Sequence, residues 1–357
     1  MGNDATLRTV NVPVQSGQPE EASPHPLDVV GMGSSLVDVV STVDDETIDR
    51  LGLERGTMML VDLAVAEGIY AEMGPTVEVS GGSAANTVAG VAALGGAAAF
   101  VGKIAADPFG EVFAHDIRAA GVEFRAAVHD PGDAGEVLGT GRCLVLVTAD
   151  ADRTMATHLG AATTITPADV PLDLVERGRV LYLEGYLWDM DPAKQAMRRA
   201  IEVAHDHDGA VAFSLSDPFC VERHRREFLD LVAADVDVLF GNEEEMCRLF
   251  DVARLREALT SAEDLGILVA ATRGPAGSIV LTGTGHTEID AMPVDEVVDT
   301  TGAGDLYAAG FLYGLTHGLD PAACARLGSV CAAEVVSHLG ARPQKDLVEL
   351  ARDAGLL

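Results

Sequence analysis

A single carboxylate, Asp305, stands where a glycine-rich turn, TGAGD at residues 301–305, runs into an apolar helical pattern. Gly302 and Gly304 carry no side chain, so a ligand could approach the backbone closely there. The first N–H groups of the helix have no partner within it and lie at the positive end of its dipole. They belong to Gly302, Ala303, Gly304 and Asp305. Such amides bind anions, and an acid beside them suits phosphoryl transfer. The alternative is that Asp305 is an ordinary helix cap.

Two other glycine-rich turns are weaker candidates for a phosphate site. GMGSSL, at residues 31–36, follows a strand but lacks the third glycine of a dinucleotide fingerprint. GGAAAFVGKI, around residues 96–104, has the outline of a P-loop. Its glycine spacing is one residue too long, however, and Ile104 follows the lysine where a P-loop has Ser or Thr. The sequence therefore favours TGAGD as the anion site.

Asn242 and Glu245 begin a predicted helix directly after the strand-like run VDVLFG. They lie three residues apart and therefore on one face of that helix. The pair could be a capping box and nothing more. It could also act on Mg²⁺ through water, because Mg²⁺ keeps several of its waters when it binds to proteins. The two roles can coexist.

The elements that must position these residues alternate regularly after residue 165. Strand-like runs such as VLYLEGY, AVAFSLSD and VDVLFG are each followed by a helical pattern, and the chain ends in helices. This alternation predicts an α/β fold with a mostly parallel central sheet covered on both faces. Two β-like stretches, about 39–80 and 123–156, stand outside the alternation. We expect them to form a small lid of strands that excludes water from the reaction.

The composition sets further limits. Residues 1–26 are polar and contain proline, which predicts a flexible tail before one domain over residues 27–357. Hydrophobic residues make up 48% of the chain but aromatic residues only 4%, so the core must be built from Ala, Val and Leu. Five scattered cysteines without a CxxC pair favour reduced thiols and a cytoplasmic location. We expect neither a signal peptide nor a transmembrane segment.

The net charge of -32 bears on the partners of the protein. Phosphate binding needs a basic face, so we expect neither nucleic acid nor an anionic membrane as a partner. The acidity itself has two interpretations: an arginine-rich composition with a solvated acidic surface, or adaptation to high salt. A thermal melt with and without molar KCl separates them.

At this point five segments, in this order, carry a resemblance to a known family: GGSAANTVAGVAALGG from residue 81, GKIAADPFG from 102, NEEE from 242, TRGPAG from 272 and DTTGAGDLYAAGF from 299. From about residue 27 onward the chain resembles the ribokinase (PfkB) family of carbohydrate and nucleoside kinases. The resemblance implies a ribokinase-like three-layer α/β/α domain with a small β-strand lid. GMGSSLVD, LEGYLWD and SLSDPF are most similar to the adenosine kinase branch. Ser34 and Ser35 depart from that branch, which typically has Asn-Pro there, and leave room for another sugar-like alcohol.

The resemblance implies roles for residues at matching positions. Asp305 matches the catalytic base, and the amides of Gly302, Ala303 and Gly304 match the anion hole. The other matches are Asp38, Gly82, Asn86 and Arg153 for the substrate, Asn242 and Glu245 for phosphate and (through water) Mg²⁺, Thr272, Gly274 and Gly277 for ATP, and Asp299 and Thr301 for a monovalent cation such as K⁺. Phe219 and Trp188 could line a pocket for the base, with core packing as the alternative for both.

The substrate residues also have purely structural interpretations. Asp38 could be a strand-end acid, Gly82 a turn before a helix, and Asn86 a polar residue of a first helical turn. Their chemistry nevertheless suits a sugar, because one carboxylate can accept hydrogen bonds from two adjacent hydroxyls.

The function that the resemblance implies is transfer of the ATP γ-phosphate, with Mg²⁺, to the 5′-hydroxyl of adenosine, which gives AMP in purine salvage. The alternatives are a kinase of ribose, fructose or a related sugar, or of another nucleoside. A non-catalytic nucleoside- or sugar-binding regulator is disfavoured, because TGAGD and the NxxE pair are both intact. The sequence leaves open whether the protein is a monomer or a homodimer.

Overall fold

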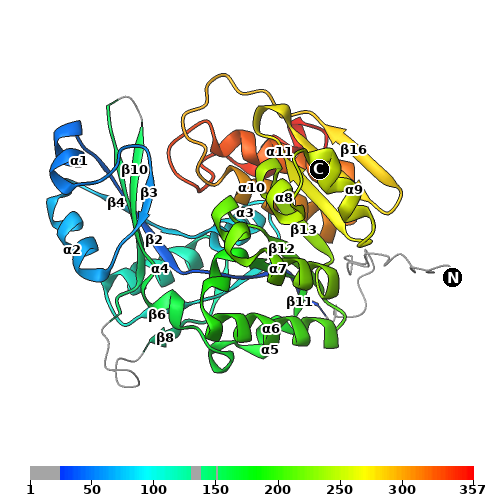
Figure 1. The fold of residues 1–357 in the computed structure, drawn as a ribbon, viewed down its shortest axis with the longest axis horizontal. Coiled ribbons are helices and arrows are strands. Elements are labelled where there is room, and N and C mark those ends of the chain that lie inside the picture. The colour runs from blue at the N-terminus through cyan, green and yellow to red at the C-terminus, as the bar shows by residue number, and fades with distance from the viewer. Residues whose placement is uncertain (1–24, 130–137, 150–151) are drawn as a thin grey trace.

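The structure is a computed structural model that describes residues 25–129, 138–149 and 152–357. The predicted tail, residues 1–26, lies outside this range except for its last two residues, and residues 130–137 and 150–151 of the second predicted lid stretch also lie outside it. Figure 1 shows a large α/β body with a smaller sheet against one side of it. No helix of the described ranges is long and apolar enough to cross a membrane.

The central sheet contains nine strands of the described chain, in the order β16-β15-β14-β13-β12-β11-β1-β5-β7. The pairs from β14 to β7 are parallel, and β15 and β16 are added antiparallel at one edge. The predicted mostly parallel sheet is therefore confirmed. Its strands are β1 (Leu27–Met32), β5 (Ala98–Val101), β7 (Glu123–Phe124), β11 (Gly178–Glu184), β12 (Ala210–Ser214), β13 (Val238–Asn242), β14 (Leu268–Thr272), β15 (Ser278–Thr282) and β16 (Gly285–Ile289).

Helices cover both faces of this sheet. Neighbouring residues of one strand face opposite layers, so Val29 and Val30 of β1 belong to different hydrophobic clusters. The parallel strands β1 and β11, inside the sheet, are buried along their length for the same reason. One layer consists of α3 (Ser83–Ala93), α4 (Pro108–Ala119), α10 (Ala303–Thr316), α11 (Pro321–Val335) and α12 (Leu347–Asp353), and the other of α5 (Leu172–Val175), α6 (Asp191–Asp206), α7 (Pro218–Ala234), α8 (Glu243–Phe250) and α9 (Leu255–Glu263).

A second sheet, called the small sheet here, has the strand order β3-β10-β9-β2-β4. These strands are β2 (Leu36–Thr42), β3 (Met58–Leu60), β4 (Val77–Gly81), β9 (Gly141–Val147) and β10 (Arg153–His158). Val37 and Val39 point to the face that packs on α1 (Asp45–Leu51) and α2 (Leu63–Glu72). Because side chains alternate along a strand, Asp38 and Arg153 lie on the opposite face, with the apolar cluster around Val145.

The small sheet differs in extent from the predicted lid. It begins at Leu36, because β2 follows β1 after only a short turn. Glu123 and Phe124 form an edge strand of the central sheet beside β5, and β8 (Ala127–His129) pairs with β6 (Lys103–Ala105). Strands of two or three residues are too short for an alternating pattern, so only their pairing partners assign them to a sheet.

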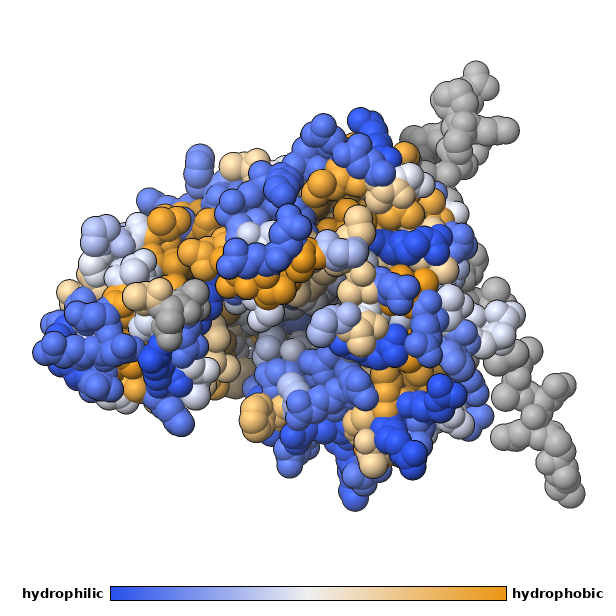
Figure 2. Space-filling model, turned by 90° about the horizontal axis from the view of Figure 1, so that it is seen from above, coloured by the Kyte–Doolittle hydropathy of each residue, from blue (hydrophilic) through white to orange (hydrophobic). Residues whose placement is uncertain are grey.

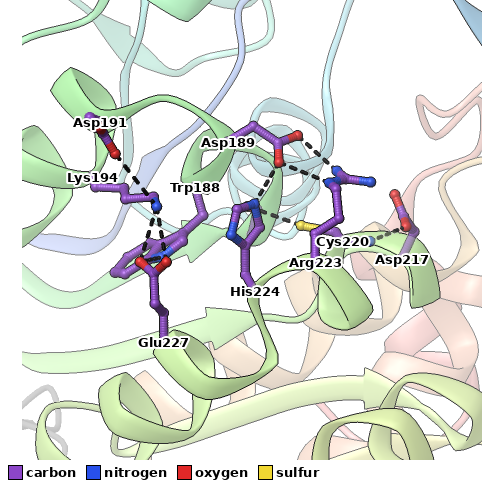
Figure 3. Close-up of polar contacts among 10 residues, drawn as sticks. Trp188, Asp189, Asp191, Lys194, Asp217, Cys220, Arg223, His224 and Glu227 are labelled. Carbon is purple, nitrogen blue, oxygen red and sulfur yellow. Dashed lines mark hydrogen bonds and ion pairs between the residues drawn. The ribbon is translucent and has the colours of Figure 1, made fainter.

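A group of polar contacts fixes the turn after β11, the 3₁₀ helix η4 (Gly185–Asp189), to α7 (Figure 3). Asp189 accepts two hydrogen bonds from Arg223, at 3.1 and 2.8 Å, and lies 2.6 Å from Nε2 of His224. Trp188 is fully buried and donates from Nε1 to Glu227 at 2.8 Å. The ring of Trp188 therefore packs in the core against α7, which was the alternative to a place in a base pocket.

Candidate active site

Asp305 lies in the first turn of α10 but does not cap that helix. The N-cap position is Gly302, with φ +79°, and no side chain caps the helix there. A Cβ at Gly302 would lie 2.6 Å from Cβ of Ala341, so this turn requires glycine on both conformational and steric grounds. Asp305 instead reaches across to α3, where it accepts hydrogen bonds from Ser83 Oγ at 2.7 Å and Asn86 Nδ2 at 2.9 Å. The carboxylate is thus held by neutral donors of a different helix.

These surroundings explain why the pKa of the Asp305 carboxyl is higher than usual. Burial raises the pKa of its carboxyl, and the hydrogen bonds from Asn86 and Ser83 and the charge of Arg342 oppose that rise without cancelling it. No cation is bonded to it directly among the hydrogen bonds and ion pairs of the described residues. A carboxylate that is easier to protonate than usual can accept a proton from an alcohol and keeps its place while doing so.

Some of the backbone amides beside Asp305 already donate hydrogen bonds within the protein, and others do not. The N–H of Ala303 donates to the carbonyl of Thr300 at 3.2 Å, and that of Leu306 to Gly302 at 2.8 Å. The amides of Gly304 and Asp305 make no such backbone bond within the described residues. An added Cβ at Gly304 would meet no atom within 4 Å, so open space lies in front of this turn. Of the three predicted anion-hole residues, Gly304 is therefore better placed than Ala303 to donate to an oxyanion.

The predicted sugar residues gather around the β4–α3 turn. Asp38 of β2 lies against this turn, since a Cβ at Gly81 would be 2.4 Å from its Oδ2. At the next position, Gly82 has φ +95°, and a Cβ there would be 2.3 Å from the carbonyl oxygen of Ser34. Asn86, which bonds to Asp305 through Nδ2, has a buried Oδ1 without a hydrogen-bond partner within the described ranges. The two glycines therefore let Asp38 and Ser34 pack closely against the turn, and one amide oxygen beside Asp305 remains unused.

Asp38 lies close to the turn that contains Asp305. It packs against Gly81, and Ser83, two residues later, donates to Asp305, so the structure brings the two acids to one site although they are far apart in the sequence. Burial raises the pKa of Asp38 from 3.8 to about 6; Arg342 and Arg153 lower it, whereas the charges of Asp305 and Asp299 raise it.

The sequence analysis missed Arg342, which joins the two sides of the site. Its guanidinium donates to the carbonyl of Ser80 at 2.8 and 3.0 Å and to that of Ala85 at 2.9 Å. Burial lowers its pKa from 12.5 to about 10, and Asp116, Asp38 and Asp305 oppose that shift. Arg342 thus supplies a buried positive charge between two acids without bonding to either. One arginine in a loop after a helix carries no local signal of such a role.

Glu184, at the end of β11, was missed as well. It is fully buried, and its two oxygens accept hydrogen bonds from the amides of Ser34 at 2.7 Å and Ala84 at 2.9 Å. Burial raises its pKa from 4.5 to about 7, with these hydrogen bonds opposing. It therefore ties the turn after β1 and the start of α3 to the central sheet. The signal that could have revealed it is an acid directly after the apolar run Val180–Leu183.

The predicted nucleotide residues lie at the ends of neighbouring strands. Asn242 and Thr272 are directly paired in the sheet register of β13 and β14. Gly274 and Gly277 bound the turn after β14, with φ values of +56° and +81°. A Cβ at Gly277 would lie 2.0 Å from the carbonyl of Ile289, so the tight turn needs glycine there. The structure brings these residues together at one edge of the sheet.

Asn242 and Glu245 form the capping box that the sequence allowed. Asn242 N–H donates to Glu245 Oε2 at 2.8 Å, and Glu245 N–H donates to Asn242 Oδ1 at 2.9 Å. Burial raises the pKa of Glu245 from 4.5 to about 7. No three His, Cys, Asp or Glu side chains of the described chain converge as a metal-ligand set. Both carboxylate oxygens of Glu245 are bonded to Asn242, so the predicted role of this residue toward Mg²⁺ would run through water.

Phe219 was predicted to line a pocket for the base. Its ring, in the first turn of α7, is 68% exposed, and the guanidinium of Arg248 on α8 lies 6.0 Å from the ring centre. The charge of Asp217, two residues earlier, helps to raise the pKa of Glu245, so the start of α7 lies near the Asn242–Glu245 pair. A place for Phe219 in a base pocket stays a prediction.

Arg153 and Asp299, predicted for substrate and for a monovalent cation, contact each other. Nη2 of Arg153 lies 2.6 Å from Oδ2 of Asp299, and Nη1 donates to Thr301 Oγ1 at 3.1 Å. The small sheet thereby meets the turn that precedes α10. The space-filling view shows a hollow between the part of the molecule that contains the small sheet, the small-sheet lobe, and the large α/β body (Figure 2).

Known proteins share this architecture. An adenosine kinase from Sinorhizobium meliloti is 43% identical, with a TM-score of 0.84 over 92% of this chain and 99% of its own. A probable sugar kinase from Rhizobium etli is 41% identical, with a TM-score of 0.85 over 93% and 100%. Adenosine kinase from Saccharomyces cerevisiae is 28% identical over 334 residues, 87% of this chain and 95% of its own. Fold and site together define an ATP-dependent kinase with the ribokinase-like fold.

The family model for pfkB family carbohydrate kinases matches residues 56–346. The chain therefore belongs to the PfkB family. The predicted family and fold are confirmed, and the kinase activity follows from them.

Proposed function

We propose that the protein transfers the γ-phosphate of ATP to the 5′-hydroxyl of adenosine and releases AMP and ADP. The observation that carries this proposal is the position of Asp305. Neutral donors from α3 hold it at the start of α10, next to free amides and opposite Asp38. Similarity to adenosine kinases from Sinorhizobium meliloti and Saccharomyces cerevisiae supports the nucleoside.

The chemistry requires one proton transfer and one phosphoryl transfer. Asp305 accepts the proton of the 5′-hydroxyl as that oxygen forms its bond to the γ-phosphorus. The bond between the γ-phosphorus and the oxygen that bridges to the β-phosphate breaks, and ADP leaves. A general base of this kind contributes about 10²–10⁴-fold to the rate.

The amides of Gly304 and Asp305 would stabilise the charge on the transferred group. They point out of the positive end of α10, where donors to a developing charge are each worth about 10²–10³-fold in rate. Mg²⁺, when bound with ATP, neutralises phosphate charge, and Glu245 and Asn242 would hold its water shell. Thr272, Gly274 and Gly277 would hold the nucleotide beside them, because their turn lies directly next to Asn242.

The ribose would lie against the β4–α3 turn. Asp38, which packs directly against Gly81, can accept hydrogen bonds from the 2′- and 3′-hydroxyls. The unused Oδ1 of Asn86 can accept a further hydroxyl donor. A hydroxyl that filled this position would satisfy a buried acceptor that otherwise has no partner among the described residues.

A sugar kinase is the second candidate. The similarity to a probable sugar kinase from Rhizobium etli favours it, as does Ser34-Ser35 in place of Asn-Pro. Asp38 and Asn86 would then bind the hydroxyls of a monosaccharide.

The test is to follow ADP release from ATP and Mg²⁺ with a panel of nucleosides and sugars. We expect turnover with adenosine, AMP as the product, and none in Asp305→Asn. Asp189→Asn is the matched control, because it changes an acid outside the site. Turnover with sugars and not with nucleosides would replace adenosine with the second candidate. Undiminished turnover in Asp305→Asn would remove Asp305 as the base.

A further inference from the structure

The turn before α10 contains a carboxylate that needs a counter-charge. Asp299 is 5% exposed, and its Oδ1 and Oδ2 accept hydrogen bonds from the amides of Thr301, at 2.9 Å, and Gly340, at 2.8 Å. It therefore shapes the turn that leads into the anion hole and ties it to the segment after α11. A buried carboxylate with only neutral donors is costly, so such groups are normally paired with a cation.

The guanidinium of Arg153 meets that need. Its Nη2 lies 2.6 Å from Asp299 Oδ2, and its Nη1 donates to Oγ1 of Thr301 at 3.1 Å. Both partners are sheltered, with side chains that are 12% and 2% exposed, so solvent screens the pair little. Two charge-assisted contacts to one turn also fix the geometry of the guanidinium.

These contacts occupy the position that the sequence analysis gave to a monovalent cation. The Asp299 carboxylate and the Thr301 hydroxyl are the two side-chain groups assigned to that cation, and Arg153 binds both. An added cation at Asp299 would stand close to the guanidinium. Two like unit charges at such short range repel strongly in the low dielectric of a sheltered site. The residues present therefore do not fit a K⁺ site.

We propose that Arg153 is the resident cation of this site, a positioning residue that neutralises Asp299 and makes the kinase independent of monovalent cations. Arg153 belongs to β10 of the small sheet, whereas Asp299 belongs to the turn of the large body. The charge that stabilises the anion-hole turn is therefore supplied only where the small sheet lies against the body. A free ion would bind regardless of that contact.

This inference rests on the kinase reaction at Asp305 but not on the identity of the phosphoryl acceptor. The first experiment measures ADP release by the unaltered protein in KCl, NaCl and tetramethylammonium chloride at equal ionic strength. We expect the same rate in all three salts. A several-fold higher rate in KCl than in tetramethylammonium chloride would overturn the proposal.

The second experiment removes the charge of Arg153 and tests whether a cation added to the solution can replace it. Arg153→Ala should lower kcat by about 10²-fold, the usual effect of misplacing catalytic groups. K⁺ or millimolar guanidinium should then recover part of that loss, and Arg153→Lys, which keeps the charge, should need neither ion. Arg55→Ala is the matched control: Arg55 is also an arginine of the small-sheet lobe, but it pairs with Asp45 at 3.2 Å and Asp152 at 3.1 Å.

A third measurement needs no substrate. We expect K⁺ to raise the melting temperature of Arg153→Ala above its value in tetramethylammonium chloride, and to have no such specific effect on the unaltered protein or on Arg55→Ala. Absence of any cation-specific effect in Arg153→Ala, in both rate and melting temperature, would overturn the proposal. If no acceptor were phosphorylated by any form, the proposed function would fail while the melting data still decided the role of Arg153.

Discussion

Two carboxylates of this protein sit in contrasting surroundings. Asp189, in η4, faces the guanidinium of Arg223 and the imidazole of His224, and Asp305, in α10, faces the neutral groups of Ser83 and Asn86. Burial acts to raise the pKa of Asp189, but the hydrogen bonds from Arg223 and His224 outweigh it and lower that pKa. At Asp305 burial prevails over its neutral donors, and the pKa is raised.

The difference separates a structural acid from the acid that we propose as the base. The hydrogen bonds from Arg223 and His224 stabilise the charged form of Asp189, so this group holds η4 to α7 as a carboxylate. At Asp305 the nearest positive charge, Arg342, is bonded to backbone carbonyls and acts only through space. Its carboxylate is therefore oriented without being neutralised, which is the state a general base requires.

The largest expected effect is that of Asp305→Asn. We expect kcat to fall by about 10²–10⁴-fold, because the proton acceptor is lost.

The same variant should change how stability depends on pH. The pKa of Asp305 is higher in the folded than in the unfolded protein, so between these two values the folded state binds more protons. The free energy of unfolding therefore falls as pH rises through the folded pKa of Asp305. The melting temperature of Asp305→Asn relative to the unaltered protein should therefore increase from pH 4 to pH 8. A difference independent of pH would mean that the acid is not perturbed.

The second effect concerns the open space in front of α10. Gly304→Ala adds a methyl group that meets no protein atom within 4 Å, so we expect an unchanged melting temperature. The rate should nevertheless fall by about 10²-fold, because the methyl group displaces the phosphoryl group from the amides. Gly302→Ala is the comparison variant: at φ +79° and 2.6 Å from Ala341, it should lose stability as well. Full activity in Gly304→Ala would separate this turn from the reaction.

A smaller effect is expected from Ser83→Ala. This variant removes one neutral donor to Asp305, and a donor to the charged form lowers a pKa. The pKa of Asp305 should rise further, so the acidic limb of the kcat/KM profile should move to higher pH by about one unit or less. Ser41→Ala, which loses a bond to Pro75 in the small-sheet lobe, is the control and should leave the profile in place. A shift toward lower pH would contradict the account of Asp305.

The smallest effect is expected at Asp189. Arg223→Ala removes two hydrogen bonds at a partly exposed pair, which should cost about 0.2–1 kcal/mol of unfolding free energy. The lowered pKa of Asp189 contributes stability above its unfolded value, and that contribution disappears as pH falls through the folded pKa. The two proteins should therefore converge in stability in acid, with the same pH profile of activity. A shift in the pH profile of activity in Arg223→Ala would contradict the distinction between Asp189 and Asp305.

Much of this site follows from local patterns. The turn TGAGD, the helix behind it and the Asn242–Glu245 pair are each short in sequence, and the structure contains a helix that begins at Ala303 and a capping box of Asn242 and Glu245. Ser83 lay within the predicted GGSAAN segment but was not assigned a role, although it stands three residues before Asn86 on one helical face.

The sequence by itself determined the α/β alternation, the acid in the TGAGD turn and the PfkB membership, because each is carried by residues adjacent along the chain. The tertiary structure alone decided that the charge of Arg342 acts on both Asp38 and Asp305, that Arg153 pairs with Asp299, and that Asp305 bonds to the neutral groups of Ser83 and Asn86. Charge pairing depends on distances through space between residues separated by many elements. No spacing in a sequence reports those distances, and they set the pKa of each acid.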